Sequence, residues 1–516
     1  MSASRQKKIR QDLAANGVID PKIIRQAEED AKQRKNNILY GCIFGAFVLV
    51  AAVVLLWNSG IFQRNATALE VNGEKYTTAQ VDYYYASAYN SIATSQYASY
   101  YGFDKSKPAD QQDLNDTAKM MLGVSEDMTW DAYFRDTAKD KLTNVYAVCN
   151  AAAKDEFAFS DAMQKELDST MDAVAQYAKQ NGMSVKAYLK AMFGTYMTPA
   201  VFEQMIKDSI IAEHYEENYV DNLKYSDEEI SKYYKENKES LDVASYEYIY
   251  FNGTASSTTD ADGNTVDPTD AEKAAAVTAA KDNAKAAKAR YQDGEKLEKI
   301  ANDYENASYA NPTVSTNTGD VVSSWIFDNA RQPGDMKLLQ DGDNYYLAVF
   351  HQRGRNEYNT VNVRHILIKV DTSALDEKSD TYETDLAALK DTKKAEAEKI
   401  LKEWKEGAAT EEFFGELAGK YSEDGAEGGL YKQVYHNQMV TEFNDWIFDE
   451  ARQAGDTAIV ETTYGYHVMY FVGTDLPYWQ VQAINALKNT DHSDWITALT
   501  KDVTVEEGPG FKYVTK

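Results

Sequence analysis

Apolar side chains recur every three or four residues through much of the chain after residue 60, the spacing of amphipathic α-helices. One stripe has this spacing at Met163, Leu167, Met171, Val174 and Ala178. Thr198-Pro199 favours a further helix start. The pattern predicts a helical domain over residues 60–240. We interpret the stripes as core packing; the alternative is that some methionine and aromatic side chains form exposed grooves for other polypeptides.

Two local signals mark the ends of this helical region. Residues 68–77 are typical of a short hairpin, because Asn72-Gly73 favours the positive φ angles of a tight turn. Thr77 or Thr78 can then cap a helix. Near the far end, Ser226 and Glu229 have the spacing of a capping box, which predicts another helix.

The rest of the chain contains two stretches in which strands enclose helices. Four segments have strand composition: 246–251, 345–350, 363–370 and 466–471. Helical patterns lie between them, at 271–291, 391–406, 410–421 and around 439–447, and an acidic loop is expected up to 385. This order predicts α+β domains with antiparallel sheets. We place them at 243–353 and 360–475, followed at 476–516 by an amphipathic helix and an irregular tail.

An eleven-residue segment occurs twice in these stretches. Residues 325–335 recur at 446–456 with nine of eleven positions identical, and the offset from Trp325 to Trp446 is 121 residues. A repeat of this length indicates a duplicated domain rather than a small structural repeat. The two stretches are therefore expected to share one fold.

Residues 38–57 contain no charged side chain and are long enough to cross a bilayer as a helix. Three basic residues precede them closely: Lys32, Arg34 and Lys35. The positive-inside rule then places residues 1–37 in the cytoplasm and the remainder outside the cell. A cleaved signal peptide is the rival interpretation. No clear cleavage site follows the segment, so we favour an uncleaved anchor and a single-pass protein of the cell membrane.

The net charge narrows the choice of partners. The formal charge is −28 at pH 7, and an acidic surface repels phosphate, so nucleic acid is not an expected partner. We interpret the excess of acids as a solvated surface. Cys42 and Cys149 are the two cysteines and do not constitute a disulfide framework.

Two of the six histidines occupy expected strands at opposite ends of the second stretch. His365 and His467 can meet across a sheet if the first and last strands are neighbours. Histidines in strands are more often structural than functional, so their spacing alone leaves both interpretations open. The first stretch has Tyr248 and Tyr346 at the aligned places.

Residues 361–473 resemble the parvulin-type peptidyl-prolyl cis–trans isomerases. Five motifs in the order and spacing of that family carry the resemblance: Val363-Arg-His-Ile-Leu-Ile, Leu417-Ala-Gly-Lys-Tyr-Ser-Glu-Asp, Gly428-Gly429, Gln438-Met-Val-Thr-Glu-Phe and Tyr464-Gly-Tyr-His. More loosely, residues 68–240 look like the helical chaperone domain of the PrsA, SurA and PpiD foldases. The resemblance implies one active parvulin domain at 360–475 and a degenerate one at 243–353.

The resemblance also implies roles for individual residues. His365 and His467 match the paired histidines of the family, and Asp424 matches its central Cys/Asp position. Met439 and Phe443 match the apolar floor that receives the proline ring. Tyr431 stands where a pocket leucine is usual, which would reshape the pocket. No cofactor or metal is expected. Some parvulins select phosphoserine through a basic cluster after the first strand; here 371–385 is acidic, so phosphate dependence is not expected.

Three functions follow as hypotheses. The first is an extracytoplasmic foldase that isomerises proline-containing segments of unfolded or nascent exported polypeptides and also holds them. The alternative is a non-catalytic, membrane-anchored holdase with vestigial parvulin domains. A third, less favoured, is a surface protein of architecture or attachment. The foldase resemblance leaves a clamp-like homodimer open, and between a periplasm and a Gram-positive surface we favour the latter.

Overall fold

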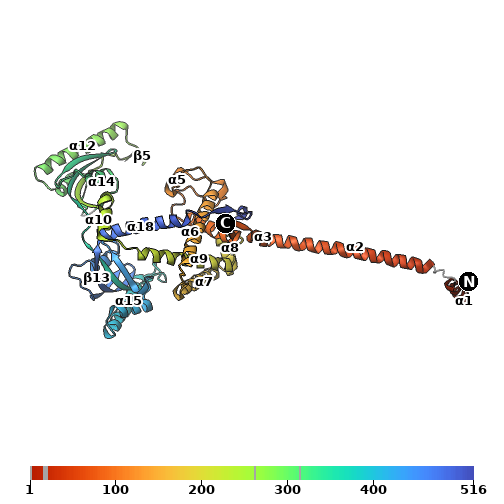
Figure 1. The fold of residues 1–516 in the computed structure, drawn as a ribbon. Coiled ribbons are helices and arrows are strands. Elements are labelled where there is room, and N and C mark those ends of the chain that lie inside the picture. Colours follow the sequence, from red (N-terminus) through yellow and green to blue (C-terminus); the bar gives the residue numbers. More distant parts are fainter. Residues whose placement is uncertain (1–2, 16–20, 261–262, 313–314, 516) are drawn as a thin grey trace. The chain divides into compact units, whose positions relative to one another are not determined.

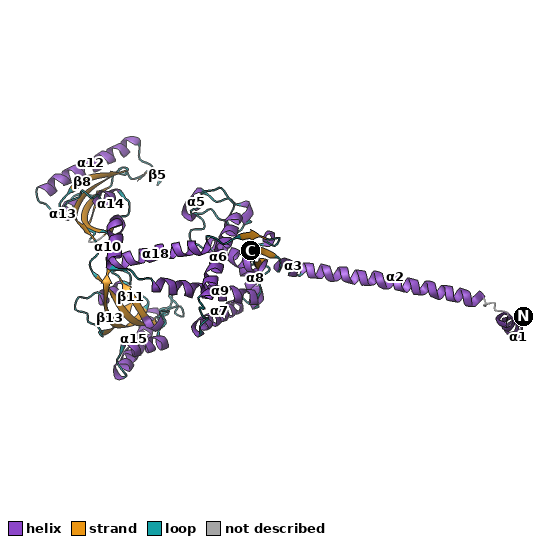
Figure 2. Cartoon of the chain, viewed as in Figure 1, coloured by secondary structure: helices purple, strands orange, loops and turns teal. Residues whose placement is uncertain are grey.

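The structure is a computed structural model that describes residues 3–15, 21–260, 263–312 and 315–515. The chain divides into two compact units: unit 1 comprises Met1–Leu223 with Asp491–Lys516, and unit 2 comprises Lys224–Thr490. Helices dominate unit 1, whereas unit 2 contains two antiparallel sheets with helices against them (Figures 1 and 2). The α+β class predicted from the sequence is confirmed.

Unit 1 contains a small sheet and several helices. Its elements in chain order are α1 Ala3–Ala15, α2 Pro21–Asn58, α3 Ile61–Arg64, β1 Thr67–Val71, β2 Glu74–Thr77, α4 Thr78–Ala93, η1 Ala109–Gln111, α5 Asp116–Leu122, α6 Trp130–Lys154, α7 Asp161–Gln180, α8 Val185–Phe193, α9 Pro199–Asn222, the end of α18 (Tyr478–Thr500), β14 Val505–Glu507 and η3 Phe511–Tyr513. Its core is aromatic, with Trp130 and Phe134 of α6 fully buried.

The predicted hairpin and helix caps are confirmed. Asn72 and Gly73 have φ angles of 48° and 85° and join β1 to β2. Thr77 caps α4 in a capping box with Gln80, because the Thr77 amide donates to the Gln80 side chain at 2.8 Å. Thr198 caps α9, which begins at a proline. These local signals work because each satisfies backbone groups within a few residues.

The predicted irregular tail is partly wrong. Residues Val505–Glu507 form β14, which pairs antiparallel with β1. The Arg135 guanidinium of α6 donates to the carbonyls of Phe511 and Val514 at 2.8 and 2.6 Å. The strand has no pattern of its own because its partner lies more than 400 residues earlier in the chain. The C-terminal segment is therefore an integral part of unit 1.

Helix α2 includes the apolar segment predicted to be an anchor. Within the described part of the chain, no helix combines the length and the apolar character needed to cross a membrane. The side chains of residues 38–41, the start of the predicted anchor, lie outside the described set, as do residues 16–20 of the predicted cytoplasmic segment. From Ile43 to Trp57, the large apolar side chains that are described are mostly exposed.

Unit 2 has two sheets of matching order. Its elements are α10 Asp227–Glu236, α11 Lys238–Leu241, β3 Val243–Phe251, β4 Thr258–Thr259, β5 Thr265–Val266, α12 Asp270–Gln292, α13 Leu297–Ala301, β6 Ala307–Ala310, β7 Ser315–Thr316, α14 Val321–Ile326, β8 Met336–Asp341, β9 Asn344–Gly354, β10 Asn359–Lys369, α15 Tyr382–Glu406, α16 Glu411–Tyr421, η2 Glu427–Gly429, β11 Leu430–Val434, α17 Thr441–Ile447, β12 Thr457–Thr462, β13 Gly465–Pro477 and α18 Tyr478–Thr500. The strand orders of these two sheets are β6-β3-β9-β8, with β7 also paired to β3, and β11-β10-β13-β12; β4 and β5 form a separate two-stranded sheet.

Each of the two larger sheets is covered on both faces. We call residues 243–354 the first α+β region and residues 359–477 the second. Helix α12 packs on one face of the first sheet (Figure 1) and α14 on the other; α15 and α16 pack on one face of the second sheet and α17 on the other. Helix α15 begins at Tyr382, nine residues before its predicted start at 391. Acidic residues in its first turn favour the helix N-terminus, but they provide no apolar periodicity.

Candidate functional site

The two strand histidines meet on one face of the second sheet. Strands β10 and β13 pair so that His365 lies opposite Met469 and His467 opposite Leu367. The histidines are therefore diagonal neighbours with side chains on the same face. Their ring centroids are 5.1 Å apart and their Nδ1 atoms 3.1 Å apart. Both side chains are buried, with 4 % and 5 % exposure.

A chain of hydrogen bonds extends from this pair in both directions. His365 Nε2 lies 2.8 Å from Asp424 Oδ2, and the Tyr431 hydroxyl donates to the same oxygen at 2.7 Å. At the other end, His467 Nε2 lies 2.9 Å from Thr462 Oγ1. The structure thus brings together His365, His467 and Asp424, as predicted.

The loop that carries Asp424 is attached to the middle of β10. The Leu367 amide donates to Ser422 Oγ at 3.1 Å, and the Glu423 amide donates to the Leu367 carbonyl at 2.9 Å. The Asp424 amide also donates to Ser422 Oγ at 3.2 Å. Because these bonds hold the loop to the strand that bears His365, the carboxylate has a fixed position.

An apolar floor lies beside the two imidazoles. The Phe443 ring of α17 is buried and meets both imidazoles edge to face, at centroid distances of 5.2 Å to His365 and 5.5 Å to His467. Met439 is half-buried against the same cluster. The predicted floor residues therefore lie next to the polar network.

Tyr431 has a second role that its place in the sequence did not predict. Its ring lies 5.2 Å from His365, but its hydroxyl is bonded to Asp424. A leucine at this position could not donate to the carboxylate. Thr462, which lies just before Tyr464-Gly-Tyr-His, was also not identified from the sequence. In the β12–β13 pairing Thr462 is a diagonal neighbour of His467, so its hydroxyl can face the imidazole.

Burial sets the protonation of the network. It lowers the pKa of His467 to about 4, and the neighbouring His365 adds to this shift. Burial also lowers the pKa of His365, which attraction to Asp424 only partly offsets. Partial burial raises the pKa of Asp424, but the Tyr431 hydrogen bond and the interaction with His365 outweigh it, so the net pKa is lowered. Burial and the carboxylate raise the pKa of Tyr431 to about 12. Near neutral pH we therefore expect neutral imidazoles beside a carboxylate.

With neutral rings, one arrangement of protons satisfies every bond. His365 donates from Nε2 to Asp424 and accepts at Nδ1 from His467, which in turn accepts at Nε2 from the Thr462 hydroxyl. All donors then point along the chain toward Asp424, and no imidazole N–H remains for a substrate carbonyl. In the described part of the chain, no group of three or more histidine, cysteine, aspartate or glutamate side chains could hold a metal ion.

Part of the chain is similar to a known protein family. A family model described as a PPIC-type PPIase domain matches residues 346–473. No curated protein matches the chain significantly. Solved structures with similarity include PrsA from Bacillus subtilis, with 13 % identity, a TM-score of 0.24 and coverage of 73 % of this chain and 90 % of that chain.

Two further solved structures extend the comparison. The peptidylprolyl isomerase PrsA from Bacillus anthracis has 22 % identity and a TM-score of 0.17, and the match covers 28 % of this chain and 58 % of that one. A SurA-like chaperone from Campylobacter jejuni has 12 % identity and a TM-score of 0.15, and the match covers 66 % and 97 %. The family match therefore places similarity to a PPIC-type PPIase domain at residues 346–473.

Proposed function

We propose that the second α+β region catalyses cis–trans isomerisation of peptidyl-prolyl bonds, with His365, Asp424 and His467 as catalytic residues. The observation that carries the proposal is the buried hydrogen-bonded chain of the two histidines and Asp424 beside the Phe443 ring. No nucleophile or cofactor is needed, because no covalent bond is made or broken in the reaction.

The chemistry requires a lower barrier to rotation about the C–N bond. Resonance sets that barrier at roughly 18–20 kcal/mol, and the resonance form places negative charge on the carbonyl oxygen. A dry site without donors for that oxygen stabilises the planar amide less than water does. In neutral His365 and His467 the N–H groups point along the hydrogen-bonded chain toward Asp424. The imidazoles therefore provide no donor for the carbonyl oxygen. Each tenfold increase in rate needs only about 1.4 kcal/mol.

The substrate proline would lie against the apolar floor. Phe443 and Met439 offer an apolar surface, and the Tyr431 ring borders it beside His365. Residues 371–385 contain six acidic side chains and Lys378 as their one basic residue. Recognition of a phosphate needs arginine or lysine partners, so we expect activity on unphosphorylated segments.

We further propose that the protein works outside the cytoplasm, attached to the cell membrane by residues 38–57 with its N-terminus in the cytoplasm. The exposed apolar side chains of α2 from Ile43 onward support the proposal, since apolar side chains of this density favour lipid over water. The substrates would be unfolded or nascent exported polypeptides.

A holding activity is the second candidate function, and an exposed surface of unit 1 favours it. Four large side chains between residues 97 and 121 are exposed: Tyr97, Tyr100, Met120 and Met121 at 49 %, 69 %, 75 % and 61 %. Methionine and tyrosine side chains adapt to varied apolar partners. We propose that this surface binds unfolded chains whether or not the isomerase site is active.

One experiment separates the two activities. The full-length chain is assayed for proline isomerisation in a short unphosphorylated peptide and for suppression of aggregation of an unfolded protein. In the His365→Ala/His467→Ala double variant we expect at least a tenfold loss of isomerase activity, because both polar positions are lost, and unchanged suppression of aggregation. The matched control is Tyr248→Ala/Tyr346→Ala in the first α+β region, which should retain isomerase activity. Full turnover in the histidine variant would refute the catalytic assignment.

A further inference from the structure

A cavity of about 260 Å³ lies within unit 1, among β2, α4, α6 and α9. The chemistry of its wall is set by six residues: Glu74, Tyr76, Tyr84, Tyr146, Cys149 and Asp208. Three aromatic rings and two carboxylates thus surround one small space. Among the described residues that line this cavity, none is a lysine or arginine.

Two polar groups of the wall have unused bonding capacity. The Tyr84 side chain is 96 % buried, since its exposure is 4 %, and it forms part of the cavity wall. Its hydroxyl is not among the fully enclosed polar atoms without a partner in the described part of the chain, so it can be reached from the cavity. The Asp208 carboxylate receives one side-chain hydrogen bond, from Gln204 Nε2 at 2.7 Å to Oδ1. Burial raises the pKa of Asp208, and Glu74 adds to the shift. Both groups can therefore form a further hydrogen bond with a ligand in the cavity.

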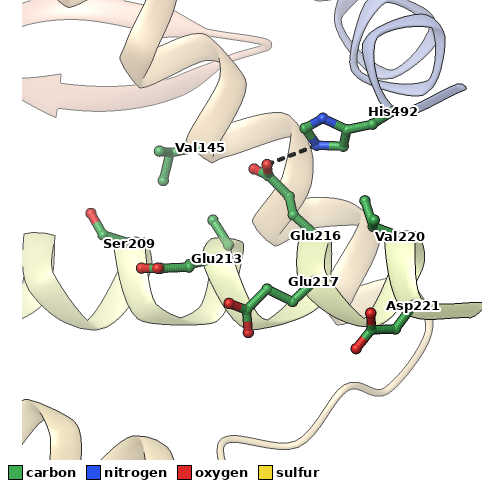
Figure 3. A pocket seen from close by; sticks show the side chains of 9 residues that line it. Val145, Ser209, Glu213, Glu216, Glu217, Val220, Asp221 and His492 are labelled. Carbon is green, nitrogen blue, oxygen red and sulfur yellow. Dashed lines mark hydrogen bonds and ion pairs between the residues drawn. The ribbon is translucent and has the colours of Figure 1, made fainter. Parts of the chain in front are cut away.

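Neighbouring cavities continue this space along α6 and α9. A cavity of about 670 Å³ shares Val145 with it and is lined by Glu213, Glu216 and Glu217. Figure 3 shows the Glu216 carboxylate turned toward His492, whose Nε2 lies 3.0 Å away. A third cavity of about 370 Å³ shares Tyr146 and Asn150. The three cavities therefore adjoin one another through shared wall residues of α6.

We propose that the tyrosine-lined cavity binds the cationic side chain of a lysine or arginine in an extended polypeptide segment, whose backbone passes through the adjoining cavity lined by Glu213, Glu216 and Glu217. Asp208 and Glu74 supply opposite charge, and the tyrosine rings supply surfaces that attract cations. The Tyr84 hydroxyl accepts a hydrogen bond from the bound group. This site is separate from the isomerase site and does not depend on the function proposed for it.

The test is binding of a fluorescein-labelled peptide to the full-length chain, followed by fluorescence anisotropy. The peptide contains glycine, serine and alanine with one central arginine and no proline, so isomerase activity does not affect the result. The comparison peptide has citrulline, which keeps the shape of arginine and lacks its charge. We expect saturable binding of the arginine peptide and at least tenfold weaker binding of the citrulline peptide. Equal affinities, or no saturable binding of the arginine peptide, would overturn the proposal.

Variants locate the site. Asp208→Asn should weaken binding of the arginine peptide about tenfold, whereas Glu203→Gln should not. Glu203 is also on α9 but is exposed and lies outside the cavity wall, so it controls for the loss of one negative charge. If Asp208→Asn does not fold, Tyr84→Phe decides the question: it keeps the ring, and we expect at least threefold weaker binding. Wild-type affinity in the folded Asp208→Asn or Tyr84→Phe variant would contradict the proposed site.

Discussion

The two α+β regions hold different side chains on matching sheets. In the second region His365 and His467 are diagonal neighbours on β10 and β13, with ring centroids 5.1 Å apart. In the first, Tyr248 and Tyr346 have the same diagonal relation on β3 and β9, at 5.7 Å. Sheet register therefore determines where the two side chains meet, whatever their chemistry.

The surroundings differ more than the sheets do. Counting back 121 residues from Phe443 and Thr462 leads to Val322 and Asp341. The first region thus has a smaller apolar residue in its helix and a carboxylate where the second has a hydroxyl. The comparison teaches that the duplicated segment belongs to a shared scaffold, while the side chains that distinguish the two regions lie in loops and at single positions.

The largest effect is expected from Gly429→Ala. Gly429 has a φ of +64°, and an added Cβ would lie 2.2 Å from the His365 carbonyl oxygen. In the first region Tyr248, which aligns with His365, pairs with Ala310. Because Ala310 already has a Cβ, the close approach that requires a glycine is a feature of the second region. We expect a loss of about 3 kcal/mol or more in the free energy of unfolding of the second region.

Urea-induced unfolding with hydrogen exchange read peptide by peptide measures this loss in each region. Gly425→Ala is the matched control, because it lies four residues earlier and its added Cβ meets no atom within 4 Å. A near-neutral Gly429→Ala would show that the backbone can move away and that the second site is less constrained than its contacts indicate.

Local signals in the sequence were sufficient for much of this fold. The turn at Asn72-Gly73, the cap at Thr77 and the repeat at Trp325 and Trp446 each depend on neighbouring residues or on direct identity. The strands that carry His365 and His467 were also predictable from their composition. The two side chains could be expected to meet if the first and last strands of the stretch, in sequence order, were neighbours in the sheet.

The remaining features depend on partners distant in the sequence. Strand β14 exists because β1 offers an unpaired edge, and nothing in residues 505–507 indicates that pairing. The Tyr431 hydroxyl bond to Asp424 requires the loop geometry that Ser422 provides through Leu367. The motif indicates that leucine is usual at the position of Tyr431, but it does not predict the hydrogen bond that a tyrosine makes there.

The next largest effect is expected in the pH dependence of stability, which should differ between the two regions. An unfolded histidine titrates near about 6.5, whereas burial lowers the pKa of folded His467 to about 4. As pH falls between these two pKa values, the unfolded chain binds a proton that the folded chain does not. The contribution of His467 to the free energy of unfolding is therefore complete above the higher pKa and decreases toward the lower one. Tyr248 and Tyr346 have raised pKa values and do not titrate there.

Hydrogen exchange at pH 7 and pH 4.5, corrected for intrinsic rates, tests this contrast. Peptides from 359–477 should lose more protection than peptides from 243–354, and His467→Tyr should reduce the difference. An equal loss in both regions would mean that the histidine pair does not dominate the acid response.

A smaller effect is expected from Tyr431→Phe. The variant removes one hydrogen bond to a charged carboxylate, which corresponds to about 1–2 kcal/mol, or roughly a five- to thirtyfold loss in kcat/KM if the network acts in the transition state. Because that bond lowers the pKa of Asp424, the acidic limb of the pH–rate profile should move to higher pH. Tyr435→Phe, an exposed neighbour, should change neither quantity. An unshifted profile would restrict Tyr431 to a packing role.

The smallest effects should come from the arginines of the repeated segment. Arg452 lies 4.2 Å from the Trp446 ring and pairs with Asp456, and Arg331 lies 5.1 Å from the Trp325 ring and pairs with the corresponding Asp335. Partly exposed contacts of this kind contribute about 1 kcal/mol or less. Arg452→Met and Arg331→Met should therefore cause similar, small losses of stability in urea unfolding and leave isomerase activity unchanged. A large loss of activity in Arg452→Met alone would place the repeated segment within the site, and the division between shared scaffold and separate chemistry would fail.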